Sequence, residues 1–75
     1  MKKFIFTFTQ SHPLRDFYQP IYARDSLTAR AKMFEIYGEN WGFEYTEEQW
    51  KIWEEEAMRM GVPLQSSLDP IYCKV

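Results

Sequence analysis

The chain has 75 residues and a formal net charge of −2 at neutral pH, with 45% hydrophobic and 19% aromatic residues. This length allows one domain, residues 1–75, with a small core, and the aromatic content excludes a disordered chain. Residues 1–33 carry six basic and two acidic groups, whereas residues 34–75 carry three basic and nine acidic groups. An acidic balance overall argues against general binding of a nucleic-acid backbone.

The cysteine content and the N-terminal residues indicate the cellular compartment in which the protein works. Cys73 is the only cysteine, so the sequence predicts no disulfide framework and a reducing environment. The apolar run after Lys2 and Lys3 is too short and too interrupted by threonine for a signal peptide. No run approaches the ~20 apolar residues that span a bilayer. We therefore expect a cytoplasmic protein that does not enter membranes.

Two strands are predicted at the start of the chain. Residues 3–9 alternate, with Phe4, Phe6 and Phe8 on one face, which indicates a strand with an aromatic core side. Residues 10–17 form a loop, and residues 18–24 form a second, antiparallel strand. Pro20 cannot donate to a strand ladder, so we expect this strand at an edge of the sheet or bulged.

A first helix is predicted over residues 26–37. Asp25 is a favourable N-cap, and Gly38 supplies a left-handed C-terminal cap. Apolar residues occupy most of the helix circumference, which predicts a helix buried on more than one side. On that winding Phe34 is a core residue, and Phe34→Ala is expected to cost about 3–5 kcal/mol.

The second half begins with a short strand at residues 41–45 and a second helix. Thr46 and Gln49 form a capping box, and the helix runs to Met60 before Gly61. Its apolar stripe is narrow, which predicts a surface helix with the stripe facing the sheet: Trp50, Trp53, Ala57 and Met60. Residues 62–69 form a loop, and alternation of Ile71, Cys73 and Val75 suggests a last short strand.

The order is therefore strand, strand, helix, strand, helix, with a final strand left open. This order predicts an α+β fold: a three- or four-stranded sheet with both helices on one face. The predicted core comprises the following side chains: Phe4, Phe6, Phe8, Ile21, Leu27, Ala31, Phe34, Tyr37, Trp41, Phe43, Trp50, Trp53 and Ala57.

Catalytic residue patterns are scarce. His12 could act as a base oriented by Asp16, but a loop histidine that bonds local backbone is the favoured interpretation. Cys73 sits on a predicted strand without a nucleophile motif and is interpreted as a small buried hydrophobe. We find no glycine-rich phosphate loop and no metal-ligand spacing. The sequence thus predicts a protein without enzymatic activity, cofactor or metal.

An acidic cluster on the second helix has two interpretations. One is a solvated helix face; the other is a negative surface that meets a basic partner. On the second interpretation the candidate partner-binding residues are Glu47, Glu48, Glu54 and Glu55, with His12 and Arg15 from the first loop. Ile52 and Met58 lie off the apolar stripe and could belong to a partner surface or a homodimer surface.

The segments FTFTQSHP, YARDSLTARAKMFEIYG and NWGFEYTEEQW together resemble a group of small uncharacterised proteins of phages and prophages. The resemblance covers most of residues 3–53. Thr9 departs from the glycine expected after the FTF run. The resemblance implies a non-enzymatic inhibitor of a host protein, such as a defence nuclease, acting in the host cytoplasm. The alternative is a nucleic-acid-binding accessory protein that uses the basic half: Lys2, Lys3, Arg15, Arg24, Arg30 and Lys32.

Overall fold

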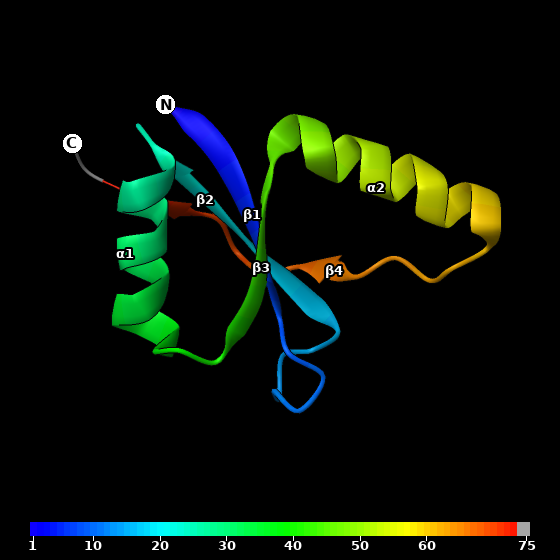
Figure 1. Ribbon diagram of the computed structural model, residues 1–75, viewed down its shortest axis with the longest axis horizontal. Coiled ribbons are helices and arrows are strands. Elements are labelled where there is room, and N and C mark those ends of the chain that lie inside the picture. Colours follow the sequence, from blue (N-terminus) through cyan, green and yellow to red (C-terminus); the bar gives the residue numbers. More distant parts are fainter. Residues whose placement is uncertain (74–75) are drawn as a thin grey trace.

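The computed structural model describes residues 1–73 and contains a mixed sheet with two helices (Figure 1). The α+β class and the order of the main elements are as predicted. The elements are β1 (Lys2–Phe8), β2 (Phe17–Ala23), α1 (Ser26–Tyr37), β3 (Trp41–Thr46), α2 (Glu47–Met60), β4 (Ser66–Ser67) and β5 (Ile71–Tyr72). The strand β4 lies in the segment predicted as a loop, and Val75 of the predicted last strand lies outside the described residues.

The sheet is built around β1. Its order is β3-β1-β2-β4, and β5 also pairs with β2. Both neighbours of β1 are antiparallel to it, with Ile5 opposite Pro20 on one side and Tyr45 on the other. The two short C-terminal strands run parallel to β2. Residues 66–73 therefore return the chain along the outer side of β2.

Pro20 is not on an edge strand, contrary to expectation. The outer neighbour of β2 is interrupted there: β4 pairs with Phe17 and Tyr18, whereas β5 pairs with Ile21 and Tyr22. The missing N–H of proline thus lies where no ladder hydrogen bond is required. Proline is expected where no neighbouring strand needs its N–H, and the gap between β4 and β5 leaves Pro20 without such a neighbour.

One face of the sheet carries the main core. Phe4, Phe6 and Phe8 of β1 pack there with Ala29 and Met33 of α1. The remaining members of this cluster come from β2 and the C-terminal segment: Ile21, Ala23 and Cys73. The alternation of residues 3–9 predicted this face correctly.

The opposite face of the sheet is covered by α2, so the prediction of both helices on one face is wrong in this respect. Trp50 packs against Tyr18 and Tyr45, with ring centroids 4.7 and 5.4 Å apart. Those tyrosines flank Thr7 and Ile5 on the side of β1 away from the phenylalanines. Figure 1 shows α1 and α2 on opposite sides of the strands. Ile5 and Thr7, which point to this second face, are both buried.

The winding of α1 also differs from the prediction. Only a narrow stripe, with Ala29 and Met33 at its centre, is buried, whereas Leu27 is 76% and Phe34 50% exposed. A single helix on a small sheet can bury only the stripe that meets the strands. Three predicted core residues of α1 are therefore exposed: Leu27, Ala31 and Phe34. Phe43 of β3 and Trp53 of α2, also predicted in the core, are exposed as well. The buried hydrophobic residues that the predicted core omitted are Ile5, Ala23, Ala29 and Met33, whereas Cys73 is buried as predicted.

Both helices begin at the predicted caps. The Asp25 carboxylate accepts a hydrogen bond from the Thr28 backbone N–H at 2.8 Å. Thr46 and Gln49 form the reciprocal capping box, and Gly38 and Gly61 end the helices with positive φ angles of 66° and 73°. Local side-chain chemistry thus fixes where the helices start and stop, although it does not choose which stripe is buried.

The Asp25 cap gives a prediction for the pH dependence of stability. The hydrogen bonds from Thr28 lower the pKa of Asp25 below its ordinary value of 3.8. A carboxyl with a lowered folded-state pKa stabilises the fold above its unfolded pKa and loses that effect as pH falls through the folded pKa. We expect Asp25→Ala to destabilise the protein most above about pH 5 and progressively less below about pH 4. Urea unfolding of both proteins from neutral to acidic pH measures this, and a pH-independent difference would contradict it.

Candidate functional site

The acidic helix α2 is anchored by Trp50 and Ala57, which are its buried residues. At 100° per residue, Glu48 and Glu55 lie on the side of the helix away from this buried pair, and both are exposed. Glu54 is half-buried, because it is nearer the buried side. The four predicted partner-binding carboxylates of α2 are therefore divided between two sides of one helix.

A continuous exposed stripe follows from the same geometry. Glu48, Lys51, Glu55 and Met58 are spaced i, i+3, i+7 and i+10, which places them in one row along the helix. All four are exposed, and the Met58 side chain is 70% exposed. We refer to these four residues as the acidic stripe. The predicted inward position of Met60 is wrong, because its side chain is 72% exposed at the last turn.

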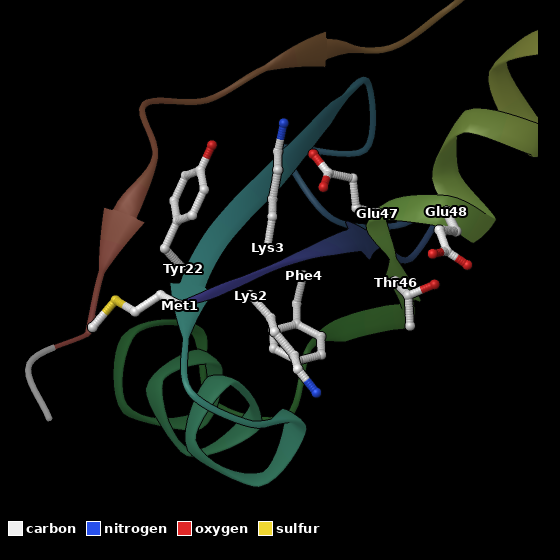
Figure 2. Close-up of a pocket in the computed structure, with 8 residues that line it drawn as sticks. All are labelled: Met1, Lys2, Lys3, Phe4, Tyr22, Thr46, Glu47 and Glu48. Carbon is white, nitrogen blue, oxygen red and sulfur yellow. The ribbon is translucent and has the colours of Figure 1, made fainter.

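A hollow of about 490 Å³ lies where β1, β2 and the start of α2 meet. Figure 2 shows Lys3, Tyr22 and Glu47 extending to one side of the strands, and Lys2 and Phe4 to the other. Lys3 and Tyr22 are register partners on neighbouring strands. Because lysines and glutamates line the same hollow, its charge is mixed, and it does not favour an anionic or a cationic ligand.

His12 has a structural position in the β1–β2 connection. Its Nδ1 accepts a hydrogen bond from the Leu14 backbone N–H at 3.0 Å. Its ring stacks on Phe8 at a centroid distance of 4.6 Å and lies near Tyr37. These contacts match a loop histidine that organises its own turn, and Leu14, not Asp16, is the partner of Nδ1.

Arg15 lies in the same connection, and its side chain is exposed. Its backbone carbonyl accepts a hydrogen bond from the Gln65 side chain, which ties the connection to the segment before β4. This connection follows Phe8 at the C-terminal end of β1, whereas Glu47 and Glu48 line the hollow beside Lys2 and Lys3 at its N-terminal end. The structure therefore does not bring the six predicted partner-binding residues together.

The basic half of the chain is partly neutralised by its own carboxylates. Arg30 pairs with Glu44, and Lys32 pairs with Glu35 at 2.8 Å. Arg24 lies 3.6 Å from the neighbouring Asp25. A phosphate backbone would compete with these carboxylates for the same cations. This arrangement does not favour the nucleic-acid-binding interpretation.

Within residues 1–73, no three His, Cys, Asp or Glu side chains are grouped so that they could hold a metal ion. None of the helices in this range is long and apolar enough to cross a membrane. Comparison with protein-family models, with curated proteins and with solved structures finds no match to this chain.

Sequence reasoning missed one exposed apolar region, around the outer strand β3. Phe43 was assigned to the core, yet its side chain is 69% exposed. Leu27 and Phe34 are exposed on the neighbouring helix α1. The signal available in the sequence was the excess of apolar residues on α1, which exceeds what one buried stripe can hold.

Proposed function

We propose that this chain is a non-enzymatic protein-binding module whose acidic stripe on α2 binds a basic surface of a partner protein. The main support for this proposal is the exposure of the acidic stripe. Glu48, Glu55 and Met58 are all exposed on α2, and the two glutamates lie on the side of the helix remote from the sheet. An exposed methionine one turn from the Glu55 carboxylate offers an adaptable apolar contact next to a charged group.

The two kinds of side chain have different parts in the proposed binding. The carboxylates steer the encounter with a basic partner and fix its orientation, so they act mainly on the association rate. Met58 supplies apolar area that leaves water when the partner binds. The ordered helix costs little conformational entropy on binding, because its capping box and its Trp50 anchor already hold it in place.

The resemblance to small phage proteins supports a host protein as the partner, with inhibition of that protein as the biological role. A protein-binding role also agrees with the engaged Nδ1 of His12, which makes local contacts in its loop. An inhibitor needs a stable surface and no reacting groups, so the fold is used as a rigid carrier of α2.

The test combines capture and charge reversal. The immobilised chain is expected to recover one defined protein from a bacterial host lysate, and capture should weaken at high salt. With that protein purified, the double variant Glu48→Lys and Glu55→Lys should associate at least roughly tenfold more slowly. Its stability should change by only a few tenths of a kcal/mol, because helix-surface charge pairs contribute no more than that.

A matched control reverses two exposed carboxylates away from the stripe, Glu35 and Glu39. This control should bind like the unmodified chain, although it changes the net charge equally. Undiminished association of the folded Glu48→Lys and Glu55→Lys variant would exclude the acidic stripe as the binding surface. Recovery of no partner at any salt concentration would contradict the protein-binding role.

A further inference from the structure

The outer strand β3 has a free edge. It is the terminal strand of the sheet, and among residues 1–73 no strand pairs with its outer side. The Phe43 N–H points inward, to the Thr7 hydroxyl at 3.3 Å. Because successive amides alternate in direction, the N–H of Glu44 points away from β1. The Thr46 N–H is already bonded to the Gln49 side chain in the capping box, so the unpaired backbone donor and acceptor on this edge are those of Glu44.

The sequence of this edge lacks two of the usual protections against pairing, although the β1–β3 register shifts between Phe6 and Phe8, a local irregularity at the Trp41 end of the strand. Trp41–Thr46 contains no proline and no lysine, the residues that commonly block an exposed edge. Its one charged residue, Glu44, accepts hydrogen bonds from Ser26 and Arg30 of α1. The Glu44 carboxylate is thus turned onto the sheet face and neutralised, so it does not repel an approaching strand.

On one face, the free edge is flanked by apolar residues of α1. Leu27, Arg30 and Phe34 share one side of this helix, at spacings of three and four residues. Arg30 reaches Glu44, and the Phe34 ring lies 5.5 Å from the Trp41 ring, so this side of α1 is the one nearest β3. Leu27 and Phe34 are at least half exposed beside the edge.

On the other face, the flank comes from α2. A groove of about 410 Å³ is lined by Tyr45 of β3 and by Ile52 and Trp53 of α2, with three polar side chains between them: Glu44, Gln49 and Glu56. Ile52 is 62% and Trp53 42% exposed. Phe43 lies two residues before Tyr45 and therefore on the same face of β3. Apolar surface thus borders the same edge on both faces of the sheet.

We propose that the occupant of this edge is a second copy of the chain, with β3 pairing antiparallel to β3 of the partner copy. A two-fold axis perpendicular to the sheet would make the two sheets continuous. It would place α1 beside α1 on one face and α2 beside α2 on the other. A suitable occupant must present a strand edge with apolar surface on both faces, and the β3 edge of this chain is itself such a surface.

The exposed area agrees with a stable dimer. At roughly 200 Å² per large side chain, the five flanking residues expose on the order of 600 Å². Backbone and neighbouring atoms of β3 bring this to the ~800 Å² per partner that specific interfaces bury. These residues are Leu27, Phe34, Phe43, Ile52 and Trp53. A 75-residue domain with a small core gains most from covering such surface. Ile52 lies one helical turn from Glu48 and from Glu55, so the interface adjoins the acidic stripe. The two surfaces use different residues, and the dimer does not rest on the proposed function.

Sedimentation equilibrium of the full chain tests the dimer. We expect a species of twice the 9.1 kDa chain mass that dissociates on dilution. Phe43→Lys and Ile52→Lys should each weaken association at least roughly tenfold, because each places a charge in the interface. Met58→Lys is the matched control: it is equally exposed on α2 but lies on the flank away from β3, and it should dimerise normally.

Hydrogen exchange provides a second readout that requires no substitution. The outward Glu44 amide should be protected at high concentration and lose protection on dilution, whereas the inward Phe43 amide should change less. A monomer at all concentrations up to about 1 mM, beyond the range of specific interfaces, would overturn the proposal. A dimer that forms equally well with folded Phe43→Lys and Ile52→Lys would also overturn it, since the interface would then lie elsewhere.

Discussion

Met33→Ala is expected to lower the free energy of unfolding by roughly 2–5 kcal/mol, the range for a large aliphatic side chain truncated in a core. Met33 is fully buried and packs in the cluster between α1 and the phenylalanine face of β1. The next residue, Phe34, is a matched control on the same helix. Half of its side chain is in solvent, so Phe34→Ala should cost only about 1–2 kcal/mol despite removing a larger group.

Urea unfolding of the two variants measures this difference directly. The orientation of α1 expected from the sequence alone places Phe34 in the core. It therefore predicts that Phe34→Ala loses more stability than Met33→Ala. A greater loss for Phe34→Ala than for Met33→Ala would show that α1 turns its other side to the sheet. Equal slopes of free energy against urea in both variants are needed for the comparison, because they show that the unfolded states are alike.

The limits of α1 could be read from the sequence, whereas its orientation could not. Asp25 and Gly38 act through backbone groups within a few residues, so their effect is local and visible in the sequence. Which stripe is buried depends on where the strands lie, and apolar residues on most of the circumference offered several candidates. In α2 only one apolar stripe exists, so the burial of Trp50 and Ala57 was predicted correctly.

The two covered faces of the sheet illustrate a second limit. Residues 3–9 alternate phenylalanine with Ile5 and threonine, a pattern typical of a strand with one wet face. A threonine can nevertheless be buried when its hydroxyl is engaged, and Thr7 accepts a hydrogen bond from the Phe43 N–H. That contact joins residues 36 positions apart, and no periodicity in the sequence reports it.

Some features of the candidate surfaces could likewise be predicted from the sequence, and others could not. The exposure of Glu48 and Glu55 follows from helical periodicity once Trp50 is placed inward. The local role of His12 was also expected, because it depends on its own turn. The free edge of β3 could not be foreseen, since it depends on the order of strands in the sheet. Surfaces made by one helix are thus readable from sequence, while surfaces made by strand order are not.

Substitution of a buried glutamine, Gln19, is expected to cause the second large loss of stability. Nothing in the sequence indicated that this residue is buried. Gln19 is 2% exposed and lies beside Pro20, where the outer neighbour of β2 is interrupted. Its Nε2 donates to the carbonyl oxygens of Pro20 and Asp69, at 2.9 and 2.8 Å. Its Oε1 accepts from the Tyr37 hydroxyl at 2.7 Å. One side chain therefore links β2, the end of α1 and the turn between β4 and β5.

Gln19→Leu is expected to cost roughly 2–4 kcal/mol, because it leaves several buried or half-buried polar groups without a partner. Tyr37→Phe removes one of the same hydrogen bonds and should cost about 1 kcal/mol. If the two side chains act through each other, the double variant should lose less than the sum of the single losses. Urea unfolding of the four proteins gives this coupling, and strict additivity would show that the Tyr37–Gln19 bond contributes nothing.

The same glutamine should also control how firmly the C-terminal segment is held. Asp69 lies between β4 and β5, and the flanking amides of Leu68 and Cys73 donate to Tyr18 and Tyr22 of β2. Without the Gln19 bond to Asp69, these two amides should exchange with solvent faster than the global loss of stability explains. Amides of the β1–β2 ladder should follow the global loss alone. An equal increase in the exchange rate of all these amides would mean that Gln19 stabilises the whole fold and does not specifically stabilise the C-terminal segment.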